Sequence, residues 1–244
     1  MERMIDIHTH ILPGVDDGSQ DWEETLQMCK TAVEMGITHM VATPHFIPGA
    51  YTQGVKRGPI LLEELREKLQ TEGIPLEVSL AAEIEPFPEM VQWIEEGRLP
   101  LYSSGRHILV ESPTFSSPPW LEDLVRDLLA IGLIPILAHP ERSALVHNPL
   151  LESMKELGAE IQIDAGSLVG LWGREIQKEA WIMIEKGWAL YVASDSHRAG
   201  SRDPKLLERA HRALTKKGGK NLAKALTREN PLKVITPQYN PKSL

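Results

Sequence analysis

Histidine and carboxylate residues recur in this sequence just after short apolar runs, and this pattern is the first indication of chemistry. His8 and His10 follow the first run, and residues two apart in an extended chain share one face. Asp195 and His197 repeat that spacing near the other end of the chain. The remaining candidates lie in the loop after the first run, where Asp16 and Asp17 are alternatives, or at the ends of later runs: His45, Glu83, Glu111 and His139.

Imidazole and carboxylate groups without a thiolate suit Mn²⁺, Fe²⁺ or Zn²⁺, whereas Ca²⁺ and Mg²⁺ usually bind oxygen alone. A single such residue is more often an ordinary hydrogen-bonding group, but five of the nine histidines occupy these positions. The candidates exceed what one ion can accept, so they indicate a cluster of two or three divalent ions. Three such ions would outweigh four carboxylates, and the resulting positive charge would attract an anionic substrate.

Two arginines lie close to these candidates in the sequence. Arg142 follows His139 in the segment His-Pro-Glu-Arg, and Arg202 lies in the loop after the last pair. A guanidinium group can hold phosphate oxygens through two parallel hydrogen bonds, so we expect both to bind phosphate, with Arg198 a weaker candidate than Arg202. The other histidines are expected to be surface or packing residues: His39, His107, His147 and His211.

Seven β-rich runs alternate with helical patterns, which predicts an α/β fold with parallel strands. The predicted strands are Met4–His8, Thr38–Thr43, Leu76–Glu83, His107–Glu111, Leu133–His139, Glu160–Asp164 and Trp188–Asp195. The predicted helices are Trp22–Met35, Pro59–Thr71, Pro119–Ile131, Pro149–Leu157, Arg174–Lys186 and Pro204–Lys217. No glycine-rich nucleotide loop follows a strand, which favours a closed barrel of seven repeats over an open doubly wound sheet. The candidate residues would then meet on one rim. Asn230–Leu244 is predicted to be an irregular tail.

The composition is that of an ordinary folded protein, with 244 residues, 42% hydrophobic residues and a formal charge of −8. We expect one domain over residues 1–244, and the acidic balance disfavours a nucleic acid partner. The longest nearly apolar run, Leu128–Ala138, is about half of the roughly 20 residues that span a membrane. The start of the chain lacks an export pattern and Cys29 is the single cysteine, so a cytoplasmic protein is expected.

Four segments together resemble the polymerase-and-histidinol-phosphatase (PHP) superfamily, and more narrowly the manganese-dependent protein-tyrosine phosphatases of bacterial capsule and exopolysaccharide clusters. These segments are DIHTHILPGVDDG at 6–18, ATPH at 42–45, AHPER at 138–142 and ASDSH at 193–197. The resemblance extends from about residue 4 to 202. It implies a distorted seven-stranded (β/α)7 TIM-like barrel with a site for three metal ions, Mn²⁺ being expected and Fe²⁺ or Zn²⁺ being alternatives.

The resemblance also implies which residues hold each ion. The first ion is assigned to His8, His10, Glu83 and Asp195; the second to Glu83, Glu111 and His139; the third to Asp17, His45 and His197. Asp17 is preferred over Asp16, and Glu83 over Glu85, on this basis. The implied reaction is hydrolysis of phosphotyrosine by a metal-activated water, with Arg142 and Arg202 on the phosphoryl group. The implied substrate is the tyrosine-rich tail of a membrane-associated autokinase.

Other functions fit parts of the pattern. Another PHP phosphoesterase, such as a histidinol-phosphate phosphatase, would share the metal site, and an amidohydrolase barrel also opens with His-x-His. A nuclease is disfavoured by the acidic charge, and a non-catalytic metal-dependent binding module remains an alternative of another class. A cysteine-dependent phosphatase is excluded because the arginine of its C-x₅-R loop is replaced by Met35 after Cys29. No G-x-S-x-G serine motif is present either.

Overall fold

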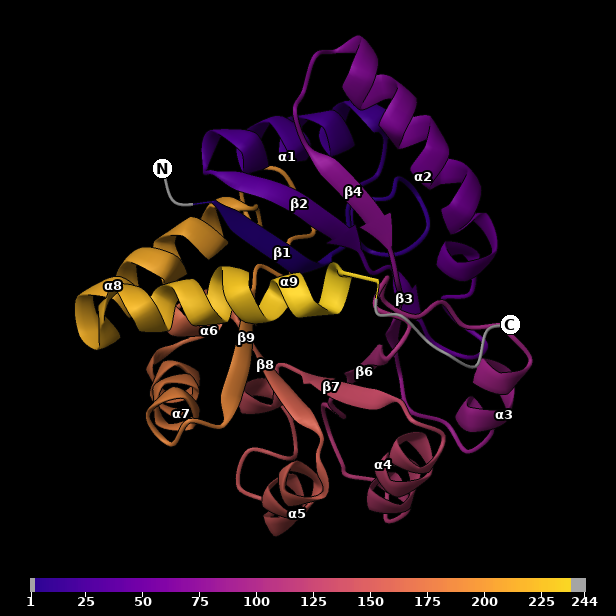
Figure 1. Cartoon of the computed structure of the whole chain (residues 1–244), viewed down its shortest axis with the longest axis vertical. Coiled ribbons are helices and arrows are strands. Elements are labelled where there is room, and N and C mark those ends of the chain that lie inside the picture. The colour runs from indigo at the N-terminus through magenta and orange to yellow at the C-terminus, as the bar shows by residue number, and fades with distance from the viewer. Residues whose placement is uncertain (1–2, 238–244) are drawn as a thin grey trace.

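The computed structural model describes residues 3–237 and confirms the alternation of strands and helices (Figure 1). The strands are β1 (Met4–Thr9), β2 (Ile37–Ala42), β3 (His45–Phe46), β4 (Glu77–Leu80), β5 (Glu83–Ile84), β6 (His107–Glu111), β7 (Ile134–Ala138), β8 (Glu160–Asp164) and β9 (Ala189–Ala193). The α-helices are α1 (Trp22–Glu34), α2 (Gln53–Thr71), α3 (Met90–Glu95), α4 (Leu121–Ala130), α5 (Pro149–Leu157), α6 (Ala165–Leu168), α7 (Arg174–Glu185), α8 (Lys205–Lys224) and α9 (Asn230–Ile235). Two further helical turns are not α-helical: η1 (Pro140–Arg142) is a 3₁₀ turn and η2 (Ala225–Glu229) is a π-helical turn.

The strands form two parallel sheets, ordered β1-β2-β4 and β3-β5-β6-β7-β8-β9. β3 and β5 continue β2 and β4 after two residues each, and the backbone bond from Ala81 N to Ala42 O extends the pairing across these interruptions. The nine strands therefore correspond to the seven predicted ones. Asp195 N donates to His8 O and His10 N donates to Ser196 O, so the segment after β9 lies beside the end of β1. The fold is a distorted seven-stranded TIM-like barrel, as predicted.

The larger apolar cluster lies between strands and surrounding helices, and its fully buried members include Met28 of α1 and Leu65 of α2. A smaller cluster joins residues from β1, β2, β6, β7 and β9 with Tyr102 and Val234. Leu109 belongs to this second cluster and shares a strand face with Glu111, two residues further along β6. The apolar cluster therefore continues directly into the residues at the ends of the strands.

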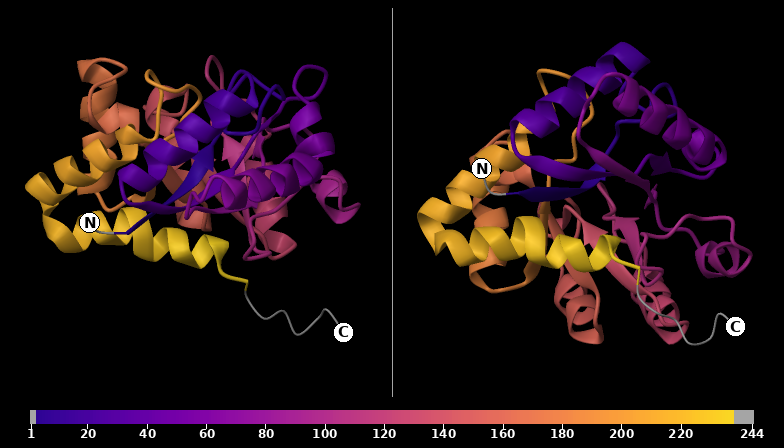
Figure 2. Two further views of the ribbon diagram at one scale, coloured as in Figure 1. Left: turned by 90° about the horizontal axis from the view of Figure 1, so that it is seen from above. Right: turned by 45° about the horizontal axis from the view of Figure 1, so that its top comes forward.

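The prediction of an irregular tail from Asn230 is wrong for its first part, because Asn230–Ile235 forms α9. Pro231 lies in the first turn of this helix, where a missing backbone N–H breaks no helical hydrogen bond. Ser104 N donates to Val234 O, and the Asn230 side chain donates to Leu190 O, so α9 packs where β6 and β9 begin (Figure 2). Residues 238–244, the rest of the predicted tail, lie outside the described residues.

Several helix boundaries also differ from the prediction. α2 begins at Gln53 instead of Pro59, and α8 extends beyond Lys217 to Lys224 with a break at Gly219. A Cβ on Gly54 would lie 2.5 Å from the Pro44 side chain, so this extra turn of α2 packs tightly against the loop before β3. The local sequence pattern does not contain this contact, and in that pattern Pro59 indicates the start of the helix. Within residues 3–237 no helix is both long and apolar enough to cross a membrane.

His107 at the start of β6 provides a test of the packed core. Burial, together with the charge of Arg106, lowers the pKa of His107 to about 4, and its Nδ1 lies 2.8 Å from Ser104 Oγ. An unfolded histidine titrates near pH 6.5, so the unfolded chain binds more protons between these values and stability falls as the pH falls. Between about pH 7.5 and 4.5, the free energy of unfolding should fall by about 2 kcal/mol less in His107→Asn than in the original protein. Urea unfolding of both proteins across this range measures the effect, and parallel pH dependences would contradict it.

Candidate metal centre

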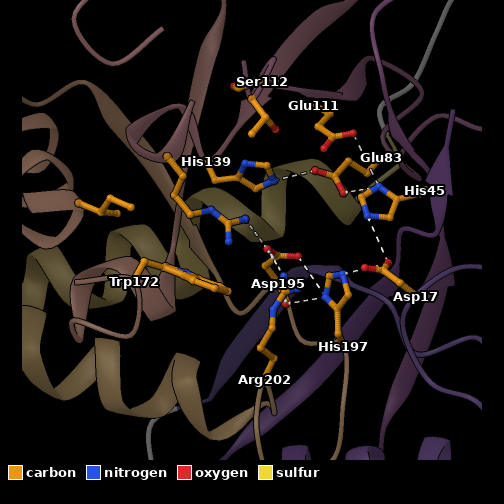
Figure 3. A pocket seen from close by; sticks show the side chains of 13 residues that line it. Asp17, His45, Glu83, Glu111, Ser112, His139, Trp172, Asp195, His197 and Arg202 are labelled. Carbon is orange, nitrogen blue, oxygen red and sulfur yellow. Dashed lines mark hydrogen bonds and ion pairs between the residues drawn. The ribbon is translucent and has the colours of Figure 1, made fainter. Parts of the chain in front are cut away.

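The structure brings all nine predicted ligand residues to one rim of the strands. Figure 3 shows those of them that line the adjoining cavity. His8 lies in β1, and His10 and Asp17 lie in the loop after it. The others occupy the start of β3 and β5, the end of β6, and the segments after β7 and β9: His45, Glu83, Glu111, His139, Asp195 and His197. Residues that are far apart in the sequence therefore meet because the carboxyl ends of parallel strands share one side of the fold.

Glu83 is the central carboxylate of this group and is fully buried. Its Oε2 lies 3.1 Å from His8 Nε2, 3.3 Å from His10 Nε2 and 3.1 Å from His45 Nδ1. Its Oε1 lies 2.8 Å from His139 Nε2. Burial alone would raise the pKa of Glu83, but the surrounding imidazoles, led by His8 and His45, hold its pKa well below the usual value. Glu83 is therefore a carboxylate that four histidines share.

Asp195 connects the histidines with the arginines. Its Oδ1 lies 3.4 Å from His8 Nε2, while its Oδ2 accepts hydrogen bonds from Arg142 Nη2 at 2.6 Å and from Arg202 Nη2 at 2.7 Å. Burial raises the pKa of Asp195, but His8 and His10 and the two guanidinium groups outweigh burial and keep the pKa well below normal. One carboxylate thus fixes the position of both predicted phosphate-binding arginines relative to the histidines.

The backbone is strained at two positions of this site. Asp195 has φ of 50° and His139 has φ of 38°, and they are the non-glycine residues with positive φ among residues 3–237. A left-handed backbone costs free energy for residues with a side chain and persists where the surrounding structure fixes it. Strain of this kind clusters at functional sites, and both residues here belong to the predicted ligand set.

Hydrogen bonds at the far side of three of the imidazoles fix their orientation. His8 Nδ1 donates to Gln162 Oε1 at 2.8 Å, and His10 Nδ1 donates to Asp16 Oδ2 at 2.8 Å. His197 Nδ1 donates to the backbone oxygen of Asp195 at 3.0 Å. These bonds leave the Nε2 lone pairs pointing into the group, as in metal sites where a second contact sets the histidine tautomer. No role was predicted for Gln162. Its position on the predicted strand Glu160–Asp164 was the feature of the sequence that could have indicated a place near the site.

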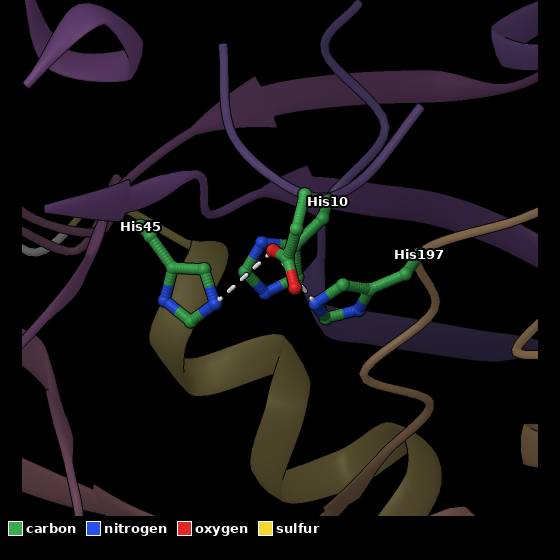
Figure 4. A group of neighbouring side chains, drawn as sticks. His10, His45 and His197 are labelled. Atoms are coloured by element: carbon green, nitrogen blue, oxygen red, sulfur yellow. Dashed lines mark ion pairs between the residues drawn. The ribbon is translucent and has the colours of Figure 1, made fainter. Parts of the chain in front are cut away.

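Asp17 faces a second group of histidines, which consists of His10, His45 and His197. Asp16 instead orients His10. Asp17 Oδ1 lies 3.5 Å from His45 Nε2 and 3.4 Å from His197 Nε2. The hydrogen bond with His197 is the main cause that lowers the pKa of Asp17. Figure 4 shows the three imidazoles of this group turned toward one centre. The geometry therefore separates the roles of two adjacent aspartates that the sequence alone could not separate.

The donor atoms fit divalent cations. His8 Nε2 and His10 Nε2 lie 3.2 Å apart, and two lone pairs at that distance repel each other unless a positive charge lies nearby. Within the described part of the chain, Glu83 Oε2, Asp195 Oδ1 and His45 Nδ1 are buried without a hydrogen-bond partner. Burial and the charges of Glu83 and Glu85 raise the pKa of Glu111 to about 8, a cost that a bound cation would relieve.

Three sets of ligand atoms lie close enough together to share an ion, with all atoms of a set within 4.8 Å of one another. The sets are His8, His10, Glu83 and Asp195; His45, Glu83 and Glu111; and His10, Asp17, His45 and His197. The first matches the set expected for the first ion. In the second, His45 stands where His139 was expected, although His139 Nε2 remains 2.8 Å from Glu83 Oε1. The assignment of individual residues to ions stays a prediction.

The site opens into a cavity of about 360 Å³ that Arg142 and Arg202 also line. Burial alone would lower the pKa of Arg142, but Asp164 and Asp195 outweigh burial and raise its pKa above the usual value. Asp164 ends β8, as other site residues end their strands, and that shared position was the signal by which sequence analysis could have found it. Arg142 therefore remains a cation held at the cavity.

The residues that were given no role in the site lie outside these sets. His39, His107, His147 and His211 contribute to none of the ligand sets found among residues 3–237. Arg198 pairs with Glu24 at 3.4 Å and does not line the cavity, which agrees with its lower ranking. Glu85 is exposed, whereas Glu83 is buried in the centre.

Comparisons with known proteins give one consistent family. The family described as capsular polysaccharide synthesis, CpsB/CapC, matches residues 4–236. Tyrosine-protein phosphatase YwqE of Bacillus subtilis is 37% identical over 202 residues, which cover 82% of this chain and 80% of that protein. A crystal structure from work on YwqE and on CpsB of Streptococcus pneumoniae, described as metal-dependent tyrosine phosphatases, matches with a TM-score of 0.88 at 34% identity, covering 98% of both chains.

A more distant structural match supports the barrel fold alone. A β-aspartyl dipeptidase from Fervidobacterium islandicum matches with a TM-score of 0.62 at 16% identity, and the match covers 95% of this chain and 74% of that one. The similarity in fold at such low identity fits an architecture that carries many different chemistries on its strand ends.

A metal-binding test follows from the position of Glu83. Mn²⁺ at about 100 times its dissociation constant should stabilise the folded protein by about 2.7 kcal/mol, which raises the melting temperature. Glu83→Gln should lose most of this rise, because it removes the carboxylate charge shared by the ligand sets. His147→Ala, at an exposed histidine outside the sets, is the matched control and should keep the full rise. An equal Mn²⁺-dependent rise in all three proteins would refute the proposed centre.

Proposed function

Since this chain belongs to the CpsB/CapC family of capsular polysaccharide synthesis proteins, we propose that it is a metal-dependent protein-tyrosine phosphatase. The observation that carries the proposal is one cavity in which a histidine and carboxylate cluster lies beside two arginines held by Asp195. YwqE, CpsB of Streptococcus pneumoniae and the matched crystal structure are described as tyrosine phosphatases, so a histidinol-phosphate phosphatase is not favoured.

The nine ligand candidates would hold two or three divalent ions, with Mn²⁺ as the proposed metal: His8, His10, Asp17, His45, Glu83, Glu111, His139, Asp195 and His197. When bound, such ions supply a water nucleophile that is ionised near neutral pH and positive charge opposite the phosphoryl group. The donor set of nitrogen and oxygen without sulfur supports this choice of metal.

Arg142 and Arg202 are the proposed phosphate-binding residues of the chain itself. Both guanidinium groups line the cavity and converge on Asp195 Oδ2, at 2.6 Å and 2.7 Å. Each retains further N–H donors for the phosphoryl oxygens, because a guanidinium group carries five of them. Their positive charge would stabilise the charge that develops on these oxygens in the transition state.

The chain offers no thiolate nucleophile to this cavity. Cys29 is fully buried in α1, and burial raises the pKa of its thiol to about 12, so the thiol stays protonated at neutral pH. Phosphotyrosine suits a water-based reaction, because its leaving phenol has a pKa near 10 and needs less protonation than an alkyl alcohol.

The finer parts of the proposal concern the biological setting. We propose that residues 1–244 form one phosphatase domain that acts in the cytoplasm on a phosphotyrosine protein of polysaccharide synthesis. The proposed substrate is the tyrosine-rich tail of a membrane-associated autokinase. The family match over residues 4–236 and its description as capsular polysaccharide synthesis support the domain and the process.

The metal-dependent reaction is tested with the purified protein. Phosphate release from a phosphotyrosine peptide should stop on addition of a chelator and return with excess Mn²⁺. Histidinol phosphate serves as the comparison substrate and should be hydrolysed with a much lower kcat/KM. A preference for histidinol phosphate would overturn the assignment of substrate, and no turnover of either by Mn²⁺-loaded protein would favour the binding module.

A pair of substitutions distinguishes metal-dependent from cysteine-dependent catalysis. His139→Ala should lower kcat by at least about a hundredfold while the far-UV circular dichroism spectrum stays unchanged, because it removes a contact of Glu83. Cys29→Ser should keep kcat within about twofold per folded molecule, since Cys29 lies in a helix outside the cavity. A large loss of kcat in folded Cys29→Ser would contradict the water-based reaction.

A further inference from the structure

The cavity has one apolar wall. Its other lining residues are polar or charged, whereas Trp172 and Ile176 are apolar and come from neighbouring positions, the loop before α7 and the first turn of α7. In the view of Figure 3, Trp172 lies on the side of the cavity opposite His45 and Asp17. Neither the metal cluster nor phosphate binding requires an apolar wall, so it needs another explanation.

The indole of Trp172 is held in place from its edge. Its Nε1 donates to Asp164 Oδ2 at 2.5 Å, and Asp164 Oδ1 accepts from Gly166 N at 2.7 Å. Asp164 is buried and its Oδ2 also lies 3.2 Å from Arg142 Nη1. A single buried carboxylate therefore orients both the indole and one phosphate-binding arginine, which fixes the distance between the two.

The guanidinium groups of both arginines lie over the indole ring. The Cζ atoms of Arg142 and Arg202 lie 4.8 Å and 5.2 Å from the centroid of the Trp172 ring. In phosphotyrosine a single oxygen joins phosphorus to the aromatic ring, so a phosphoryl group bound by these arginines places that ring next to them. Aromatic rings pack with their centroids about 4.5–7 Å apart, so the ring of the substrate can contact Trp172 while the arginines bind its phosphoryl group.

We propose that Trp172 and Ile176 form a subsite for the aromatic ring of an aryl phosphate, and that Trp172 thereby selects aryl over alkyl phosphate monoesters. This inference rests on the proposed phosphatase function and adds to it a residue that determines specificity. Asp164 is the positioning residue of the subsite, because it holds the indole edge while the ring itself faces the cavity. A phosphoserine side chain has no ring to pack against this wall.

Trp172→Leu tests the subsite with two peptides of the same sequence, one with phosphotyrosine and one with phosphoserine. Loss of the ring contact should lower kcat/KM for the phosphotyrosine peptide about tenfold relative to that for the phosphoserine peptide. Trp172→Phe keeps a ring and should retain most of the preference. Trp181→Leu removes a tryptophan of α7 that does not line the cavity and should leave the ratio of the two kcat/KM values unchanged.

A binding measurement separates contact with the substrate from support of the arginines. Calorimetry of the Mn²⁺-loaded proteins should show about tenfold weaker binding of a non-hydrolysable phosphonate analogue of phosphotyrosine to Trp172→Leu, with binding of inorganic phosphate within about twofold of the original protein. An equal loss for both ligands would overturn the inference, since Trp172 would then act only by holding the arginines. No loss for either ligand would also overturn it.

The outcomes also distinguish this inference from the proposed function. If the original protein hydrolyses neither peptide, the phosphatase function fails, while a selective loss of phosphonate binding would still support an aryl subsite. If the original protein is active and Trp172→Leu keeps the same preference, the subsite alone is refuted. Ile176→Ala provides a second variant in case Trp172→Leu does not fold, and it should shift the preference in the same direction by a smaller factor.

Discussion

Two carboxylates buried among imidazoles set the main constraint on this structure. Glu83 and Asp195 are almost inaccessible to solvent, and each contacts several histidine nitrogens. A buried carboxylate is costly unless positive charge compensates it, and this charge comes from protonated imidazoles, from guanidinium groups or from bound cations. The site is therefore built for cations, some provided by Arg142 and Arg202 and the rest by the proposed metal ions.

Asp195 links the two halves of the proposed chemistry. One of its oxygens faces the histidines and the other holds both arginines, so its position determines how far the proposed phosphate-binding groups lie from the cluster. Its left-handed backbone, with φ of 50°, turns the chain sharply at the end of the last strand. The strain is tolerable because backbone bonds on both sides, to His8 and from His10, join this segment to β1.

Apolar packing in the rest of the fold holds the strands whose ends form this rim. Apolar residues of alternate strand positions, such as Leu109, continue into ligand candidates such as Glu111. α9 covers the opposite end of the strands, where Val234 joins the same apolar cluster. Stability and chemistry are thus placed at different ends of the strands, which is the usual division in barrels of this type.

The sequence alone was sufficient for the alternation of parallel strands and helices and for the prediction that the candidate residues meet on one rim, whereas their role as metal ligands stays a prediction. This was possible because strand ends can be read from local patterns, and a parallel fold brings every such end to one rim whatever the exact register. Only the tertiary structure decided which imidazole meets which carboxylate, that Asp16 orients His10 while Asp17 faces the cluster, and that Asp164 holds Trp172 beside Arg142. It also decided that Asn230–Ile235 is helical. These features depend on contacts between residues far apart in the chain, whose distances and side-chain directions no local pattern contains.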